Sequence, residues 1–297
     1  MDDYARLCEA VRLDVYRNMA DRGYLKAVTR AGSVLERWRD YLEEMGHPGR
    51  SEPANPLIQP TIFPVMRTLR TPPWRDPQDI EATAVLETAA EVIREELDAL
   101  DPSQFLQYPT MILSSGRWSV LPIFVFGEPA ARLLGSRNAF PQTTRILSNL
   151  PGGCCSSPLA DALFSAHAPH TRLVPHCSWD PFRLRLHLGL HVPEKCGIRV
   201  GSEARGWKEG KVLAFHDAFE HETWNESEEQ RVVLIADLWH PDLTASEQMA
   251  ILACTRKKEI RSALMKTRAP PTLQPLFERR FAEAERLDPL VARFWEL

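Results

Sequence analysis

The sequence predicts a mainly β fold, an antiparallel sandwich or jelly roll with helices before and after it in the chain. One long segment alternates polar with apolar residues, and several short apolar segments are separated by turn-forming residues. Apolar residues also recur at helical spacing near both ends of the chain. Short strands at regular spacing, joined by turns, are typical of sandwiches and jelly rolls.

The clearest strand spans residues 182–192, where polar and apolar residues alternate without a break. Side chains of a strand point to opposite faces in turn, so one face is wholly apolar and the other carries cationic groups such as Arg185 and His187. Such alternation usually indicates a sheet with one face in solvent. The other interpretation is that the polar face supplies charged groups to a site.

Two further strands are expected downstream. Residues 211–215 form the first, and residues 231–239 form an apolar run that is typical of a buried strand. Residues 104–165 mix short apolar runs with proline and glycine, which favours short strands and turns over long helices.

Helices are expected at both ends and once in between. The spacing of apolar residues predicts helix within residues 1–46, from 80 to 100, from 247 to 265 with Ser246 as its cap, and over 275–296. The stretch HPGRSEPANP contains three prolines and a glycine and breaks the first helical region.

We therefore expect three segments. They are a helical N-terminal extension over residues 1–50, a double-stranded β-helix domain over 51–245, and C-terminal helices over 246–297 that pack on or beside this core. The oligomeric state and the source organism are not indicated by the sequence.

Composition narrows the class of protein. The 36 basic and 40 acidic residues give a net charge of −4, which provides no overall positive field for nucleic acid or an anionic membrane. The first ten residues are polar and acidic, and no run approaches the roughly 18 apolar residues that span a bilayer. Six cysteines without a C-x-x-C pair favour reduced thiols. We expect a soluble cytoplasmic protein without nucleic-acid or membrane partners.

Two histidines and an arginine near the strands are candidates for a metal and anion site. His176 precedes the alternating strand and His221 follows residues 211–215, so they can face each other at one mouth of a jelly roll. Neutral imidazoles suit Fe(II) and other late divalent metals, although two unrelated surface histidines would give the same pattern. Arg231 begins an apolar strand and needs an anionic partner, either a bound dicarboxylate or a structural salt bridge.

The segments around these positions resemble the aspartyl/asparaginyl β-hydroxylase family over roughly residues 60–245. In chain order they are PVMRTLRTPPWRDP, EVIREELDAL, FPQTTRILSNLPGG, FSAHAPHTRLVPH, HCSWDPFRLRLHLGLHVP, WKEGKVLAFHDAFEHETWN and RVVLIADLWHPDL. The resemblance implies a double-stranded β-helix core, a cupin-like jelly roll, and an oxygenase that uses Fe(II), 2-oxoglutarate and O₂.

The resemblance also implies roles for single residues. His176 and His221 fall on the iron-binding positions of the family, and Arg231 falls on the position that binds the distal carboxylate of 2-oxoglutarate. The other cosubstrate-binding positions, one beside this arginine and two near the other carboxylate, fall on Ser165, Arg185 and His187.

Ser178 stands two positions after His176, where most such oxygenases carry a carboxylate ligand. The family shares this absence, so the implied centre has two histidines and leaves room for the 2-oxo acid, water and O₂. Asp217 matches the family and could orient that water from outside the ligand shell, while Asp180 is a less favoured third ligand. Trp118 could wall the substrate pocket, although a buried tryptophan is more often core.

The implied reaction is hydroxylation of an unactivated carbon, with succinate and CO₂ as co-products. The substrate would be the β-carbon of an Asp- or Asn-like residue in a peptide, a free amino acid or a small natural-product intermediate. Halogenation or desaturation at the same kind of site is an alternative, as is a non-catalytic jelly-roll binding protein. His216 replaces an aspartate usual in the family, and SAHAPHTRLVPH lacks the glycine of the family's turn. These departures bear on substrate recognition more than on the metal site.

Overall fold

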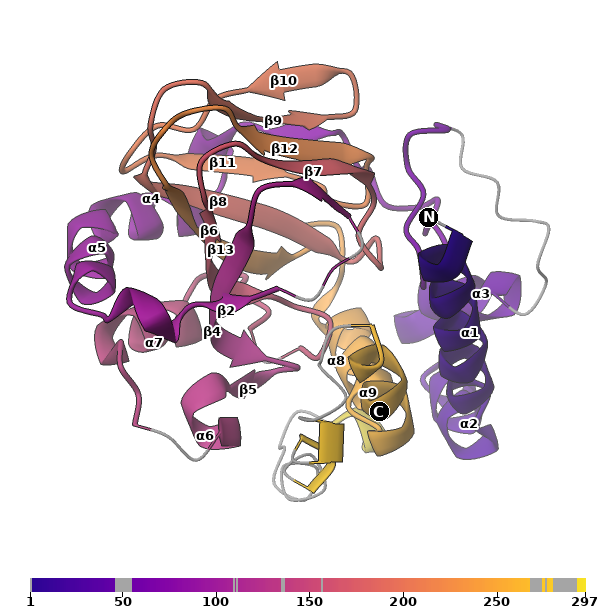
Figure 1. The fold of residues 1–297 in the computed structure, drawn as a ribbon. Helices are drawn as coiled ribbons and strands as arrows, with labels where there is room; N and C mark the ends of the chain where they lie inside the picture. Colours follow the sequence, from indigo (N-terminus) through magenta and orange to yellow (C-terminus); the bar gives the residue numbers. More distant parts are fainter. Residues whose placement is uncertain are drawn as a thin grey trace.

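The fold is a sandwich of two antiparallel sheets with helices against it (Figure 1). The computed structural model describes residues 2–45, 55–108, 110, 112–134, 137–155, 157–267, 274–275, 277–279 and 293–297. Within these ranges, no helix is both long enough and apolar enough to cross a membrane.

The larger sheet has the strand order β1-β11-β8-β13-β6-β4-β2, with β5 paired to β4. Its strands are β1 Trp74–Arg75, β2 Leu106–Gln107, β4 Trp118–Val125, β5 Glu128–Pro129, β6 Ala162–His167, β8 Arg183–His191, β11 Val212–Phe215 and β13 Arg231–Trp239. The smaller sheet has the order β10-β9-β12-β7-β3. Its strands are β3 Leu113–Ser115, β7 Thr171–His176, β9 Cys196–Val200, β10 Glu203–Arg205 and β12 His221–Asn225.

From β6 onward the chain alternates between the sheets. Strands β6, β8, β11 and β13 lie in the larger sheet, and β7, β9, β10 and β12 lie in the smaller one. This alternation is the connectivity of a double-stranded β-helix, so the predicted jelly-roll class is confirmed. The strand predicted over 231–239 matches β13 in full, and the strand predicted over 182–192 extends one residue past each end of β8.

Nine α-helices have both ends in the described part of the chain, and residues 274–275, 277–279 and 293–295 are helical as well. The nine are α1 Asp2–Met19, α2 Arg22–Arg30, α3 Glu36–Met45, α4 Glu81–Thr88, α5 Ala90–Asp98, α6 Ala130–Leu134, α7 Pro141–Ser148, α8 Ala245–Thr255 and α9 Lys258–Met265. The helix predicted over 80–100 is divided into α4 and α5 at Ala89. Most of the predicted stretch 275–296 lies outside the described residues.

Two local features differ from the predictions. Residues 104–165, where short strands and turns were favoured over long helices, also hold the short helices α6 and α7, and Pro141 occupies the first position of α7, where its missing N–H has no cost. Helix α8 is capped by Thr244 instead of Ser246. The Thr244 hydroxyl accepts a hydrogen bond from the Glu247 backbone N–H, and the Glu247 carboxylate accepts one from the Thr244 N–H.

The two faces of β8 have different environments, and neither lies in solvent. The apolar face, represented by Leu186 and Leu188, packs into a core with residues of α4, α5 and α7. The polar face turns toward the space between the sheets, where Arg183 is 2% and His187 is 6% exposed. The sheet interior is therefore the place where the cationic side chains of this strand meet.

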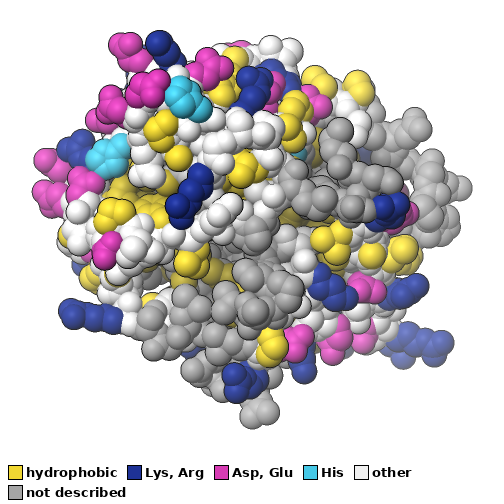
Figure 2. All heavy atoms as spheres, in the orientation of Figure 1, with side chains coloured by type: hydrophobic (Ala, Val, Ile, Leu, Met, Phe, Trp, Pro, Cys, Tyr) yellow, Lys and Arg dark blue, Asp and Glu magenta, His cyan; other side chains and the backbone are white. Residues whose placement is uncertain are grey.

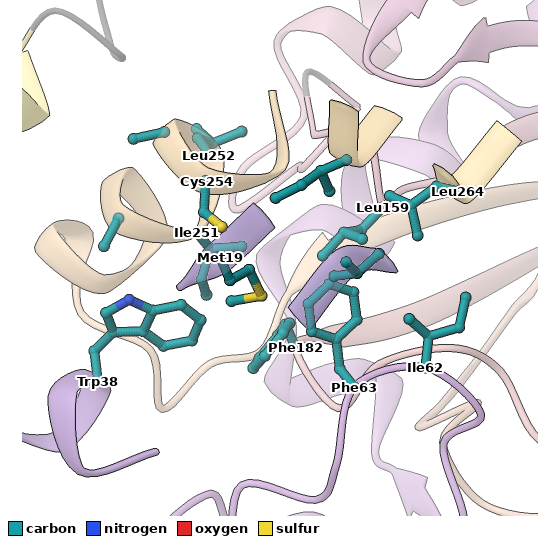
Figure 3. Close-up of a cluster of buried hydrophobic side chains, with 14 of the residues drawn as sticks. Met19, Trp38, Ile62, Phe63, Leu159, Phe182, Ile251, Leu252, Cys254 and Leu264 are labelled. Atoms are coloured by element: carbon teal, nitrogen blue, oxygen red, sulfur yellow. The ribbon is translucent and has the colours of Figure 1, made fainter. Parts of the chain in front are cut away.

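A second core joins the two ends of the chain to the sandwich (Figure 3). Residues of α1–α3 pack against α8 and α9, and Trp38 and Phe63 both lie edge-on against Phe182, just before β8. The Trp38 indole N–H donates to the Tyr24 hydroxyl, which donates to the Ala250 carbonyl. The helical ends thus share one core, and it contacts the sandwich at the start of β8.

The surface carries mixed charge. On the face shown in Figure 2, basic and acidic side chains are interspersed, and neither kind forms a continuous patch. This distribution agrees with the small net charge of −4.

Candidate active site

His176 and His221 lie directly opposite each other on β7 and β12. Their ring centroids are 4.1 Å apart, with the ring planes tilted by 52°. His221 is 5% exposed, and the last residue of β7 is His176, at the edge of the same interior. The predicted pairing across one mouth of the jelly roll is therefore present in the structure.

Each imidazole is held by a carbonyl two residues earlier in the chain. Nδ1 of His176 lies 2.8 Å from the Val174 carbonyl oxygen, and Nδ1 of His221 lies 2.8 Å from the Phe219 carbonyl oxygen. A carbonyl only accepts, so both Nδ1 atoms carry the proton and both Nε2 atoms keep a lone pair. This is the tautomer that a metal-binding histidine needs.

The electrostatic surroundings keep the pair neutral. Burial, followed by the nearby His221, lowers the pKa of His176 to about 3. Burial also lowers the pKa of His221 to about 4. Because both values lie well below 7, both rings are free of a second proton at neutral pH and fit the role of ligands to a divalent metal.

Arg231 is a buried cation without an acidic partner. It is 1% exposed, and burial lowers the pKa of its guanidinium to about 9. Its Nη1 donates to the Ser165 carbonyl oxygen at 3.1 Å, and the guanidinium lies over the Trp207 ring at 4.6 Å. No carboxylate in the described residues forms an ion pair with it. A buried charge in this state is costly unless an anion binds beside it.

Several other buried polar atoms nearby also lack hydrogen-bond partners among the described residues. They are Nε of Arg231, Nδ1 of His167, both ring nitrogens of His187, Nε1 of Trp207 and Oγ1 of Thr223. Most of these groups are hydrogen-bond donors, so a ligand rich in acceptors would satisfy them. A dicarboxylate such as 2-oxoglutarate fits this set.

A line of ring contacts joins the arginine to the histidine pair. The guanidinium of Arg231 covers Trp207, Trp207 stacks with His187 at 6.0 Å, and His187 meets Phe215 at 4.9 Å. Phe215 in turn lies 5.9 Å from His221. Arg231 and the histidine pair therefore border one interior.

Ser165 and Trp118 lie on neighbouring strands of this interior. The Trp118 indole N–H donates to the Ser165 hydroxyl at 3.0 Å, and the Trp118 ring packs against Tyr108 with centroids 4.2 Å apart. Trp118 is partly exposed, so it stands at the border of the site and not deep in the core. Ser165 offers its backbone carbonyl, not its hydroxyl, to Arg231.

Arg185 and Arg183 are held by aspartates. Nε of Arg185 lies 2.9 Å from Asp237, its Nη2 lies 2.7 Å from Asp161, and its Nη1 lies 3.2 Å from Asp217. Arg183 adds a 2.6 Å pair with Asp237. The charge of Arg185 is therefore balanced within the protein, unlike that of Arg231, and its predicted contact with a bound 2-oxo acid stays a prediction.

Ser178, Asp217 and Asp180 all contact Arg183 of this ion cluster. The Ser178 hydroxyl accepts from Nη2 of Arg183 at 2.5 Å, and its backbone N–H donates to the Asp217 carbonyl at 2.8 Å. Asp217 is fully buried, and nearby Arg183 and Arg185 lower its pKa even though burial opposes them. Asp180 lies 3.0 Å from Nε of Arg183 and is therefore engaged away from the histidine pair.

The donor set matches a centre with two protein ligands. Among the described residues, no group of three or more His, Cys, Asp or Glu side chains is arranged to hold a metal ion. In the same part of the chain, the Nε2 atoms of His176 and His221 are available as donors and no carboxylate completes a triad with them. This agrees with Ser178 at the position where a third ligand is usual.

Sequence reasoning missed two residues of the interior. His167 is 1% exposed and lies opposite Arg231 in the register of β6 and β13, and Trp207 lies on the loop before β11. The alternation of β6 offered a signal for His167, because it lies two residues after Ser165 and so shares its face. Nothing local marks Trp207, since its place depends on a loop that folds back onto β8.

Comparisons with known proteins agree with this geometry. The family model described as aspartyl/asparaginyl beta-hydroxylase matches residues 87–241. The aspartyl/asparaginyl beta-hydroxylase of Homo sapiens is 34% identical over 194 residues, which are 62% of this chain and 25% of that protein. The ornithine lipid ester-linked acyl 2-hydroxylase of Rhizobium tropici is 34% identical over 185 residues, 58% of this chain and 62% of that protein.

Among solved structures the similarity is lower, both in sequence identity and in TM-score. A Pseudomonas putida prolyl-4-hydroxylase has a TM-score of 0.32 and 12% identity, covering 53% of this chain and 87% of that one. The chain spans a quarter of the length of the human relative.

Proposed function

The chain belongs to the aspartyl/asparaginyl β-hydroxylase family, and on this basis we propose that it is an Fe(II)- and 2-oxoglutarate-dependent dioxygenase that hydroxylates an unactivated carbon. One observation supports this most directly: the buried Arg231, which forms no ion pair with any described carboxylate, shares an interior with two histidines whose Nε2 atoms are both available. An anion site beside a two-histidine metal site is what a chelating 2-oxo acid requires.

In this proposal the residues of the protein bind and orient the metal ion and the 2-oxo acid. His176 and His221 hold the metal through Nε2, and the Val174 and Phe219 carbonyls fix both rings before any ligand arrives. When bound, Fe(II) together with 2-oxoglutarate and O₂ supplies the oxidising power that inserts one oxygen atom into a C–H bond, giving succinate and CO₂ as co-products.

Arg231 anchors the far end of the 2-oxo acid. The planar guanidinium matches a carboxylate, and its position over Trp207 and against the Ser165 carbonyl fixes its orientation. His187 has two buried ring nitrogens without a hydrogen-bond partner in the described residues and meets Phe215, and in this proposal it would donate to the other carboxylate. The apolar rings of Trp207 and Phe215 exclude water from the space between these contacts.

The substrate belongs to the proposal as well. We infer a peptide with an Asp- or Asn-like residue, a free amino acid or a small natural-product intermediate as the molecule hydroxylated, as family membership suggests. The names of the relatives include both a hydroxylase of aspartyl and asparaginyl residues and one of a lipid acyl chain, so peptides and acyl chains belong in the same substrate test. Trp118 and Tyr108, at the border of the site, would contact that substrate.

The decisive experiment measures succinate. The purified protein is incubated with Fe(II), 2-oxoglutarate and O₂, and succinate is compared with that formed by His176→Ala. Candidate amino acids, peptides, lipids with acyl chains and cell extracts are then examined by mass spectrometry for the gain of one oxygen atom. Succinate at the level of the His176→Ala control would leave a non-catalytic binding protein as the better reading. A gain of chlorine, or a loss of two hydrogens, would indicate halogenation or desaturation.

A further inference from the structure

His167 lies in the middle of a row of three residues on the inner face of the larger sheet. In the strand register it lies opposite Arg231 of β13 on one side and opposite Trp118 of β4 on the other. The Trp118 ring meets the His167 ring edge-on, with centroids 6.3 Å apart. The histidine is therefore placed beside the anion-binding arginine by the sheet itself.

The ring of His167 is buried, and one of its nitrogens makes no hydrogen bond with the described residues. It is 1% exposed, and its Nδ1 has no hydrogen-bond partner among the described residues. Burial, followed by the charge of Arg231 and then of His187, holds the pKa of His167 well below its usual value. The ring is thus neutral, with one N–H to donate, and it is close enough to Arg231 to feel its charge.

An unsatisfied polar group at this depth costs free energy, and a structural role would remove that cost with a partner in the protein. In the described residues, Nδ1 of His167 and Nε of Arg231 have no hydrogen-bond partner, although Nη1 of Arg231 donates to the Ser165 carbonyl oxygen. The imidazole of His167 and the guanidinium of Arg231 would both be satisfied by one negatively charged acceptor bound between them. A carboxylate has two oxygens and can accept from the guanidinium and from the imidazole at once.

We propose that His167 is a second binding residue for the distal carboxylate of the 2-oxo acid, acting together with Arg231. This inference rests on the proposed function, because it assigns the anion at Arg231 to that cosubstrate. It makes His167 a specificity residue: it favours 2-oxo acids that end in a second carboxylate over those that end in a methyl group.

The test compares two ligands that differ only at the distal end. 2-Oxoglutarate and 2-oxopentanoate have the same chain length, but the second lacks the distal carboxylate. Their affinities for the Mn(II)-supplemented protein are measured by isothermal titration calorimetry, so no turnover is needed. For His167→Leu we expect 2-oxoglutarate to bind about 10- to 100-fold more weakly, as for a hydrogen bond to a charged group, and 2-oxopentanoate to change by less than about threefold.

Two variants serve as matched controls. His167→Gln keeps a side-chain N–H donor and should stay within about threefold of the wild type for both ligands. His170→Ala lies three residues further on, where the side chain is 61% exposed and pairs with Glu228, and it should change neither affinity. Arg231→Gln should lose the preference for 2-oxoglutarate altogether.

The melting temperature without ligand separates binding from structure. His167→Leu removes a buried unpaired nitrogen, so its melting temperature should equal or exceed that of the wild type. A lowered melting temperature together with equal weakening of both ligands would show a structural role and overturn the inference.

The failures of the inference and of the proposed function are distinguishable. If His167→Leu binds 2-oxoglutarate like the wild type while Arg231→Gln does not, His167 is not a binding residue and the proposed function stands. If the wild type shows no preference between the two acids, the anion site itself is wrong, and the proposed function fails with it.

Discussion

Arg183 and Asp237 form an ion pair inside the protein, with Nη1 of the arginine 2.6 Å from Oδ2 of the aspartate. The same carboxylate accepts from Nε and Nη2 of Arg185 and from the backbone N–H of Asp161. Asp237 is 0% exposed, so four donors depend on one buried acceptor group. This pair holds β8 against β13 on the face that forms the site.

Asp237→Asn should therefore destabilise the protein by about 3–5 kcal/mol, because the amide NH₂ would face N–H donors and two buried arginines would lose their shared partner. The free energy of unfolding is measured by urea denaturation. Asp98→Asn is the control, since that carboxylate is 53% exposed and pairs only with His191 at the surface. If Asp237→Asn lowers the free energy of unfolding by less than about 1 kcal/mol, the two arginines do not depend on this carboxylate and the prediction is wrong.

His221→Ala should abolish metal binding without unfolding the protein, because it removes one of two available Nε2 donors and leaves a small buried gap. We expect the affinity for Co(II), a spectroscopic substitute for Fe(II), to fall by more than about 100-fold. His191→Ala is the control, a histidine that is 39% exposed on its side chain and lies outside the site. Equal Co(II) binding by both variants would remove the histidine pair from the proposed centre.

The stacked pair His216 and His240 should make stability fall in mild acid. Burial, followed by the neighbouring His240, lowers the pKa of His216 to about 3, and burial lowers the pKa of His240 to about 4. In the unfolded chain a histidine titrates near 6.5, so the unfolded state gains protons first as the pH falls. Their contribution is fully present above pH 6.5 and is lost as the pH falls toward 4, at up to about 1.4 kcal/mol per pH unit for each histidine.

The measurement is urea unfolding at pH 7, 6 and 5 for the wild type and for His216→Asn/His240→Asn. The double variant should lose less stability between pH 6 and 5 than the wild type does. Other buried histidines, such as His187, remain in both proteins and act in the same direction. Parallel curves for the two proteins would contradict the prediction.

Trp38→Ala should destabilise the whole protein, not the N-terminal helices alone. The indole is 0% exposed, contacts Phe182 and donates to Tyr24, so truncation leaves a large cavity worth about 3–5 kcal/mol. Val34→Ala, 53% exposed, should change stability by less than about 0.5 kcal/mol. Two separate unfolding transitions by circular dichroism would show instead that the helical ends fold independently.

Gly189→Ala should weaken cosubstrate binding. A Cβ at this position would lie 2.3 Å from the Lys208 carbonyl oxygen, so the loop that carries Trp207 would have to move away from β8. We expect a loss of about 1–3 kcal/mol in stability and roughly tenfold weaker binding of 2-oxoglutarate, since Trp207 supports Arg231. Gly210→Ala has no atom within 4 Å of its Cβ but a φ of +70°, so it should lower stability and leave the affinity unchanged.

The sequence predicted most of the strands that form the site, because alternation and apolar runs are local signals. Strand β13 and the pairing of His176 with His221 were both expected. The direction of the polar face of β8 was not determined, since alternation is the same whether that face meets solvent or a second sheet. The aspartates around Arg185 come from three separate places in the chain, and contacts of that kind leave no local pattern.

At the ends of the chain, too, contacts between residues that are distant in sequence could not be predicted. Their helices were predicted from periodicity, but the contact of Trp38 with Phe182 joins residues that are far apart in sequence. The proposed roles of Arg231 and Ser165 rest on a family motif. The alternation of β6 places His167 on the same face as Ser165, but its position opposite Arg231 depends on the register of β6 and β13, which leaves no local pattern.

The ion cluster has a consequence for the charge of the interior. Asp161, Asp180, Asp217 and Asp237 face Arg183 and Arg185, so the cluster carries two more acids than bases. The neighbouring His176 and His221 are neutral, and the charges of Arg185 and Asp217 act on His176 from close by. At both histidines the charge of Arg185 lowers the pKa, so a positive charge on either imidazole is disfavoured. Protons would therefore compete weakly with a metal ion for the two Nε2 atoms in mildly acidic solution.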